Sequence, residues 1–586
     1  MRRTSSWRRW PGLLTVLVPT VWILGIGESA ALPTPPPSAP PEPDVRDPEA
    51  SPAPAGPSAE EAGSAVVRAA HLPDDATLEQ RGAVIGEIRI RAGDIFDLSR
   101  EAENRALFRL ANRLHRATRS QVIEQQLLFR TGDPYSRRLL EESERILRTK
   151  RYLYDARIEP VRYHGNRVDV EVVTRDVWTL RGAVSLGRSG GENNWRFEIQ
   201  DVSFLGTGKD LTLRQLDSVD RSGTMLRYRD PNLLGTRGRM ELEYSDNSDG
   251  RSQVVFAERP FYSLDARWAA GVHAFSEERI DPLYFRGELI DRIHHRQRFC
   301  ELSGGLSRGL VAGRARRWRA GITYERDEFA VAEGHAAPAV LPEDRLLVYP
   351  WIEFESIEDA FLESMDLDQI HRTEDRYLGL RWRARLGVSS PAWGGDRSRL
   401  IFSTHLTDTF VLRADEMLEL SVSGAGRWGR DGAENLLVGA RGRYYRRNFG
   451  KHLFFASLSV DYAERLDGER QLLLGGDNGL RGYPLRYQDG DRRYLLTLEQ
   501  RFYTDWYFFQ LFHIGAAVFV DVGRAWFEGG ASGVATGMLR DVGFGLRIGQ
   551  SRSSRGTLTH IDVAFPLDGD DSIRRVQFLI TTSESF

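Results

Sequence analysis

The sequence contains a single cysteine, Cys300, so it can form no intramolecular disulfide and no metal site built from several cysteines. Lysine is almost as scarce, because Lys150, Lys209 and Lys451 are the only three, and arginine supplies nearly all of the positive charge. The formal net charge is −3, which gives no electrostatic case for binding nucleic acid or an acidic membrane surface. We therefore expect no nucleic-acid partner.

Signature motifs of several enzyme classes are also missing. The chain has no H-E-x-x-H zinc motif and no phosphate-binding G-x-x-x-x-G-K-[ST] loop, and we expect no nucleophile elbow of the G-x-S-x-G type. The glycine-rich segment at 475–482 lacks the strand and helix that flank a dinucleotide loop. The twelve histidines show no metal-ligand spacing. We predict a protein that is not an enzyme, with no catalytic residues, no metal and no cofactor.

The N-terminus has the order of a secretory signal. Residues 1–10 carry four arginines, residues 12–27 form an apolar run, and the small residues near 28–31 suit a signal peptidase. We predict a signal peptide over 1–31, with a membrane anchor as the alternative. Eleven of the 25 prolines fall within 32–63, so we interpret 32–80 as a Pro-rich disordered linker. Beyond the first run, no window holds eighteen consecutive apolar residues, so no transmembrane helix is expected there.

Residues 81–178 have the pattern of one small α+β domain. Residues 83–97 alternate like a strand, and the next segment has helical spacing after a cap candidate, Thr118 or Ser120. A second helix is predicted from apolar residues between 139 and 147. Residues 157–161 and 167–173 then indicate a strand pair that turns at 164–166. The predicted order is strand, helix, helix, strand, strand.

From residue 181 to 586, short alternating segments recur between turns rich in Gly, Asp, Asn and Ser. In 513–526, Val518 and Val520 share one face, while Phe519, Asp521 and Gly523 share the other. A soluble β-sandwich and a membrane barrel both have this period. The polar face is repeatedly charged, and a lysine or arginine facing lipid at mid-depth costs about 2–4 kcal/mol, so these charges need a wet lumen. Together with the signal and the absence of a helical span, this predicts an all-β transmembrane barrel.

The length of 181–586 allows 16 antiparallel strands at roughly 25 residues each, turns included. Sixteen is therefore the predicted strand number, and twelve strands with long loops fit the same length. FLGTG at 204–208 and LLGTRG at 233–238 form a small internal repeat. Both are predicted to be tight turns between consecutive hairpins.

Several motifs together resemble one family. The segment Leu480, Arg481, Gly482, Tyr483 resembles the (V/L)-R-G-(F/Y) signature of the BamA/TamA outer-membrane insertase superfamily, and FVDVG at 519–523 resembles its F-x-D-x-G strand motif. Segments 541–547 and 560–567 look like strands of its bacterial surface antigen barrel, and the last strand ends at Phe586, the C-terminal barrel signal. Residues 83–178 are similar to a single POTRA module, the periplasmic domain of this family.

The resemblance implies that loop 475–491 folds into the barrel and is anchored there by Arg481. An arginine can donate two parallel hydrogen bonds to one carboxylate, and Asp521 is the expected acceptor. Gly523 would leave room for the loop, and Phe519 would pack on it. The alternative is an extracellular turn with a solvated arginine.

The resemblance also implies a function at the seam between the first and last strands. The first predicted strand, 182–191, is rich in glycine and serine, and the family's proposed mechanism opens this seam so that client strands can pair with an exposed edge. Ordinary edge irregularity explains the glycines equally well. The implied partners are an unfolded outer-membrane or secreted client protein, the lipid bilayer and periplasmic accessory proteins. The implied location is the bacterial outer membrane, with the N-terminal domain in the periplasm.

Three functions are therefore considered. The first is assembly, insertion or translocation of proteins by a non-enzymatic scaffold. The second is a passive outer-membrane pore, and the third is a barrel-embedded hydrolase, whose catalytic constellation a linear sequence need not reveal. The first is favoured, because the family motifs point to it.

Overall fold

The structure is a computed structural model of the 586-residue chain. It describes residues 23–24, 72–335, 338, 340–370, 373–448, 450, 452–528, 537–551, 558–569 and 573–583. Apart from the two-residue strand β1 (Ile23–Leu24), the predicted signal peptide lies outside these residues. Most of the predicted linker and the terminal Phe586 lie outside them as well.

A small α/β domain comes first. Its elements are α1 (Asp75–Gln80), β2 (Val84–Gly93), the 3-10 turn η1 (Glu101–Glu103), α2 (Ala106–Leu114), α3 (Ser120–Glu124), α4 (Arg137–Arg148), β3 (Leu153–His164) and β4 (Arg167–Asp176). The strands form a sheet in the order β2–β4–β3, in which β2 is parallel and β3 antiparallel to β4. The predicted order of strand, helix, helix, strand, strand is observed in β2, α3, α4, β3 and β4, and α1 and α2 are additional helices.

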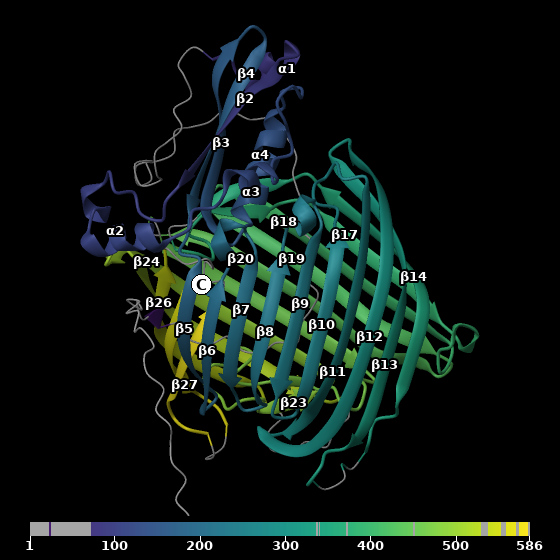
Figure 1. Ribbon diagram of the computed structural model, residues 1–586. Helices are drawn as coiled ribbons and strands as arrows, with labels where there is room; N and C mark the ends of the chain where they lie inside the picture. The colour runs from purple at the N-terminus through teal and green to yellow at the C-terminus, as the bar shows by residue number, and fades with distance from the viewer. Residues whose placement is uncertain are drawn as a thin grey trace, which may run out of the picture.

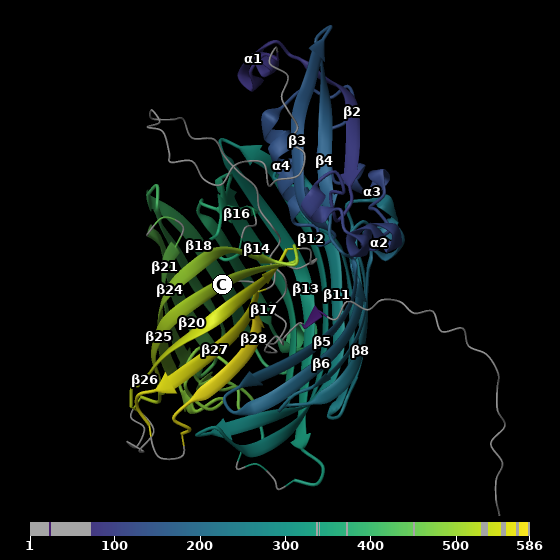
Figure 2. The same cartoon turned by 90° about the vertical axis from the view of Figure 1, so that its left-hand side faces the viewer.

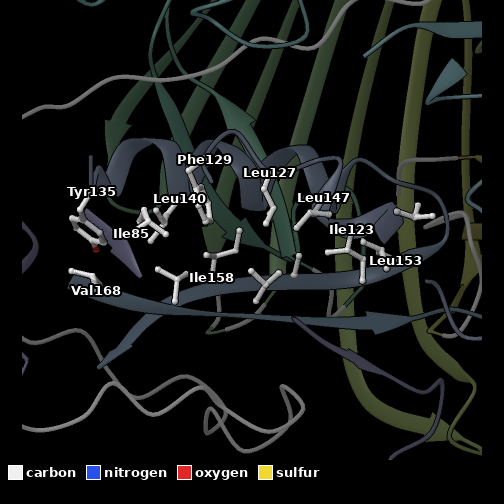
Figure 3. Close-up of a cluster of buried hydrophobic side chains, with 14 of the residues drawn as sticks. Ile85, Ile123, Leu127, Phe129, Tyr135, Leu140, Leu147, Leu153, Ile158 and Val168 are labelled. Atoms are coloured by element: carbon white, nitrogen blue, oxygen red, sulfur yellow. The ribbon is translucent and has the colours of Figure 1, made fainter. Parts of the chain in front are cut away.

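The core of this domain lies between the sheet and α4 (Figure 3). Leu140 and Leu147, one face of the predicted second helix, are fully buried against Ile158 and Val168. Leu78 of α1 is buried in the same core, so this fold begins with α1 at Asp75 and not at 81. Local helix propensity in so short a segment is weak, and tertiary packing determines that it forms.

The predicted helix cap is wrong. Helix α3 follows Arg119, and no side chain caps it. The backbone N–H of Thr118 instead donates to the buried carboxylate of Asp176, 2.7 Å away. This long-range contact fixes the chain just before the helix and is not a cap, because Thr118 precedes the N-cap residue Arg119.

The rest of the chain forms a closed β-barrel. Its strands are β5 (Leu180–Ser189), β6 (Glu192–Asp201), β7 (Asp210–Asp217), β8 (Ser222–Asp230), β9 (Arg239–Asn247), β10 (Gly250–Arg259), β11 (Trp268–Phe285), β12 (Glu288–Val311), β13 (Arg314–Val331), β14 (Arg345–Glu358), β17 (Arg381–Ser389), β18 (Arg399–Arg413), β19 (Glu416–Gly429), β20 (Gly432–Asn448), β21 (His452–Glu464), β24 (Arg492–Phe508), β25 (Phe512–Trp526), β26 (Leu539–Gln550), β27 (Leu558–Pro566) and β28 (Gln577–Ser583). Each pairs antiparallel with its neighbours, and β28 returns to β5. Figure 2 shows this junction, with the yellow C-terminal strands beside the blue β5 and β6.

Among the described residues the ring contains 20 strands, so the prediction of 16 is wrong. The prediction assigned too many residues to loops. Several connections are two-residue turns, for example Gly190 and Gly191 between β5 and β6, whose φ angles of 56° and 92° suit glycine. Because such turns take few residues, the same length of chain forms more strands. The short β1 adds a parallel pairing to β5.

The two faces of the barrel wall have the predicted parity. In β25, Phe519 and Asp521 are buried on the lumen side, while Val518 and Val520 are 47% and 37% exposed on the outside. In β26, Asp541 and Arg547 are fully buried, whereas Phe544 points outward. The wall is therefore apolar outside and charged inside. No helix in the described part of the chain has both the length and the apolar character needed to span a membrane.

The α/β domain lies at one end of the barrel (Figure 1). The repeated turns at 204–208 and 233–238 are found here as the 3-10 turns η2 (Phe204–Gly206) and η3 (Leu233–Gly235), between β6 and β7 and between β8 and β9. Gly206 lies directly against the carbonyl of Ala117, and the side chain of Gln126 donates to Asn232 at 2.7 Å. We call this end of the barrel the domain end and the opposite end the far end.

A charge on the outward face tests the orientation of the wall. We expect Phe544→Arg to lower the free energy of unfolding by about 2–4 kcal/mol, because it places a guanidinium in lipid at mid-strand. Urea titration in liposomes, followed by tryptophan fluorescence, measures this. Val311→Arg, at the domain end of β12, is the matched control, with an expected loss of about 0–1 kcal/mol. Equal effects of the two variants would contradict the assignment of the outward face.

Candidate functional site

The segment between β21 and β24 folds into the barrel from the far end. Two short strands, β22 (Leu472–Leu474) and β23 (Gln488–Gly490), pair antiparallel and hold the intervening loop. Leu480 and Tyr483 of this loop are completely buried. They pack with Leu474, Tyr487, Ala525, Leu539 and Ile573, which include residues of the barrel wall. The solvated-turn alternative therefore does not describe this loop, which we call the inward loop.

The structure brings Arg481 and Asp521 together. The guanidinium donates through Nε to Oδ2 of Asp521 at 2.7 Å and through Nη2 to Oδ1 at 3.0 Å. Its third nitrogen, Nη1, donates to Glu499 of β24 at 3.0 Å. The Arg481 side chain is 15% exposed and that of Asp521 is fully buried. A lysine has one ammonium group and could not make this arrangement of donors.

The other predicted residues surround this pair. The Phe519 ring lies under the guanidinium, with 3.3 Å between Cζ of Arg481 and the ring centroid. A Cβ on Gly523 would lie 3.0 Å from Leu474 of β22 and 3.1 Å from the carbonyl of Tyr494. Gly523 thus allows the loop strand to approach the wall, as the sequence predicts.

Gly482 and Tyr483 attach the loop to β26. The Gly482 N–H donates to Oδ2 of Asp541 at 3.0 Å, and a Cβ on Gly482 would lie 2.6 Å from Cβ of Asp541. The Tyr483 hydroxyl donates to the carbonyl of Arg540 at 2.7 Å. The four residues of the LRGY segment therefore have distinct roles. Leu480 and Tyr483 are buried in the apolar core, Arg481 pairs with carboxylates, and Gly482 permits close approach of the backbone to β26.

Glu499 is the centre of a larger ion-pair network. Besides Arg481, it accepts from Nε of Arg501 at 3.0 Å and from Nη2 of Arg547 at 3.3 Å. Arg547 also pairs with Asp562 of β27. Arginines and carboxylates alternate through this network, so each buried charge has an opposite neighbour. Because all these wall residues face the lumen, the network fixes the loop to four consecutive strands, β24 to β27.

Burial and charge act in opposite directions on Arg481. Burial by itself lowers the pKa of the guanidinium, and the carboxylates of Asp521 and Glu499 more than reverse this, so the pKa lies above its usual range. The carboxylates therefore favour the charged form of Arg481. Burial raises the pKa of the Tyr483 phenol to about 12, so its hydroxyl stays neutral and can donate.

The inward loop also contacts the first strand of the barrel. The Ser189 hydroxyl, at the end of β5, donates to the carbonyl of Gly476 at 2.6 Å. A Cβ on the neighbouring Gly190 would lie 2.2 Å from the backbone nitrogen of Leu485. Among the described residues, β28 meets β5 at the single register pair Ile580 and Arg188. The loop thus contacts β5 on one side of the seam and β25 to β27 on the other.

Sequence reasoning missed Glu499, Arg501, Asp541, Arg547 and Asp562. Alternation could have identified Glu499 and Arg501, because they share one face of β24 with Thr497 and Tyr503. No sequence signal pairs them with residue 481. Their partners lie on different strands, and only the closed barrel brings them together.

Two segments correct the expectation about the nucleophile motif. Residues 187–191 and 305–309 do have G-x-S-x-G spacing. Ser189 ends β5 and Ser307 lies in β12, so neither occupies the strand-to-helix turn of a nucleophile elbow. The Ser307 hydroxyl donates to the carbonyl of Arg316. Within the described ranges, no group of three or more His, Cys, Asp or Glu side chains could hold a metal ion.

No protein-family model matches the chain, and no curated protein matches it. Its similar solved structures include BamA from Haemophilus ducreyi lacking POTRA domains 1–3, with 12% identity and a TM-score of 0.37 over 86% of this chain and 84% of that one. CdiB from Acinetobacter baumannii is 11% identical with a TM-score of 0.39, over 85% of this chain and 74% of that one. CdiB from Escherichia coli is 12% identical with a TM-score of 0.43, over 85% and 76%.

Replacing Arg481 tests the anchor directly. We expect Arg481→Lys to speed amide hydrogen exchange in 475–490 at least tenfold, because a lysine keeps the charge and loses the paired hydrogen bonds to Asp521. Exchange in β25 and β26 should stay slow, since the barrel itself remains closed. Hydrogen-exchange mass spectrometry of the folded protein measures both.

Arg540→Lys is the matched control for this experiment. Arg540 also makes two hydrogen bonds to one carboxylate, that of Asp568, and its side chain is 48% exposed. We expect no change in loop exchange, because exposed ion pairs contribute little. Wild-type exchange in Arg481→Lys would show that the anchor does not hold the loop.

Proposed function

We propose that this chain is an outer-membrane barrel of the BamA/TamA type that assembles, inserts or translocates client proteins without enzymatic chemistry. The observation that carries the proposal is the buried pairing of Arg481, in the LRGY segment, with Asp521, in the F-x-D-x-G segment, inside a closed barrel. These two motifs carry the family resemblance.

The α/β domain is proposed to be a single POTRA-like module in the periplasm. Its sheet order β2–β4–β3 leaves β2 and β3 as edge strands, and an edge offers unpaired backbone groups to an extended partner. A client segment or an accessory protein could add a strand there. The outer membrane is the proposed location, supported by the apolar outward face of the barrel and the predicted signal peptide.

The client is proposed to engage the barrel at the seam. β5 pairs with β6 along its whole length, from Leu180 to Ser189, whereas its other edge has a single described register pair with β28, at Ile580, besides the short parallel pairing with β1. The inward loop braces β5 from inside through Ser189. A client strand could therefore replace β28 on β5 while the loop keeps the first strand in place.

A passive pore is the alternative, and the inward loop argues against it. An open channel needs no internal segment held by a buried arginine. It would show steady conductance and would not depend on Arg481. Reconstitution with and without an unfolded client separates the two functions, since only the scaffold changes the fate of the client.

A reversible lock on the seam tests the proposed function. Arg188 and Ile580 are register partners in antiparallel strands, and the usual Cα separation of such partners is one that a disulfide can span. In a Cys300→Ser background, we expect the oxidised Arg188→Cys/Ile580→Cys variant to insert an unfolded barrel client into liposomes at least tenfold more slowly than wild type. Protease protection of the client measures insertion.

Reduction of this disulfide should restore insertion. Recovery would show that the disulfide itself, and not misfolding of the variant, blocks insertion. Each single-cysteine variant should behave as wild type under oxidising conditions. Full insertion with the disulfide formed would contradict opening of the seam. Failure of the wild-type protein to insert any tested client, combined with steady conductance, would favour the passive pore.

A further inference from the structure

A second segment enters the lumen, from the domain end. Between β14 and β17 the chain forms a hairpin of β15 (Phe361–Met365) and β16 (Thr373–Tyr377), which pair only with each other among the described residues. Leu367 and Ile370 in its tip are buried against the inner wall of the barrel. They pack with Met417, Tyr445, Leu453, Tyr503, Ala517 and Leu558, which come from six different strands.

The hairpin is a unit with its own internal bonds. The Glu374 side chain accepts hydrogen bonds from the backbone N–H groups of Leu367, Asp368 and Gln369, each 3.0 Å from Oε1. Arg376 donates to Asp368 and Glu374 at 2.5 and 2.6 Å. Because its tip is organised by its own side chains, the hairpin could move as one body and keep its shape.

The tip meets the network of the inward loop at β24. Arg501 donates to the carbonyl of Leu367 at 2.7 Å and lies 3.3 Å from Oδ1 of Asp368. The same Arg501 pairs with Glu499, which pairs with Arg481. Glu499 and Arg501 are consecutive lumen-facing residues of one strand. The segment from the domain end and the loop from the far end therefore meet at this point.

The base of the hairpin is attached to the α/β domain. Arg148 of α4 makes two hydrogen bonds to Asp375 of β16, at 2.9 and 2.8 Å, and its side chain is 8% exposed. Arg157 of β3 pairs with Glu363 of β15 at 3.2 Å. The Arg145 guanidinium lies 5.1 Å from the centroid of the Phe361 ring. A displacement of the domain would act directly on the hairpin through these contacts.

We propose that the β15–β16 hairpin is a plug through which the α/β domain controls the lumen. A client that binds the domain shifts it, the Arg148–Asp375 pair transmits this shift, and the tip leaves Arg501 and the wall. The departure of the tip opens the domain end and removes one partner from the network that holds the inward loop. The proposal rests on the proposed function for the identity of the client, and concerns how that function is regulated.

The structure offers a specific lock for the plug. A Cβ built on Gly549 of β26 would lie 3.5 Å from Cβ of Ile370 in the hairpin tip, within the range of a disulfide. The same Cβ would lie 3.0 Å from the flexible end of Leu558. In a Cys300→Ser background, the oxidised Ile370→Cys/Gly549→Cys variant holds the tip on the wall.

The experiment measures client insertion into liposomes and conductance in planar bilayers for the full-length protein. With the lock oxidised, we expect insertion to fall at least tenfold and the conductance increase on addition of unfolded client to disappear. Reduction should restore both. Conversely, Arg501→Gln should raise conductance severalfold without client, because the tip loses its polar partner on β24.

Asp375→Asn tests the transmission step, with Glu343→Gln as the matched control. Glu343 pairs with Arg397, and its side chain is 82% exposed. We expect Asp375→Asn to reduce the client-induced conductance at least fivefold and Glu343→Gln to leave it unchanged. Full insertion by the oxidised Ile370→Cys/Gly549→Cys variant, with wild type active, would overturn the plug and leave the proposed function standing. Inactivity of wild type towards every client would instead count against the proposed function. The plug would then still be tested by Arg501→Gln, because an unchanged conductance in this variant would contradict it.

Discussion

The buried charge of Arg481 is the constraint on which the interior of this barrel depends. A guanidinium inside the lumen is tolerated only where carboxylates compensate it, and removing one partner of a buried ion pair typically costs about 3–5 kcal/mol. Here Asp521 and Glu499 both compensate Arg481, and Glu499 is in turn shared with Arg501 and Arg547. The position of the inward loop is thus determined by the wall and not by the loop's own turn preferences.

This constraint explains how two distant segments are coordinated. Along β24 every second side chain faces the lumen, so Glu499 and Arg501 present opposite charges one step apart. The inward loop pairs with the carboxylate of Glu499, and the β15–β16 hairpin accepts a hydrogen bond from the guanidinium of Arg501. Arginine suits such contacts because its planar fork can bind a carboxylate and a carbonyl together. The scarcity of lysine in the chain is consistent with an interior built from these forks, although composition alone would not have shown it.

The sequence predicted those features that depend on local period or on a short motif. Alternation assigned Phe519 and Asp521 to the lumen side, and the two motifs placed Arg481 opposite Asp521. The number of strands was missed because length does not determine how tightly consecutive strands are joined. Helix α1 was missed because its formation depends on Leu78 entering a distant core. The hairpin and the partners of Glu499 were missed for the same reason: their contacts join residues far apart in the chain, and no local pattern encodes them.

The seam shows why the loop is placed where it is. A closed barrel has no free edge, so a strand can be exchanged only where the hydrogen-bond ladder is short. At the seam the described ladder is short, yet β5 must keep its position if a new strand is to pair with it. The inward loop supplies this support from the lumen, through the hydroxyl of Ser189 and the close approach of Gly190. Among the described residues, the polar contacts of the loop are with Glu499 of β24, Asp521 of β25, Asp541 of β26 and Asp562 of β27. Under the opening proposed above, the support that Ser189 receives from the loop does not depend on the pairing of β5 with β28.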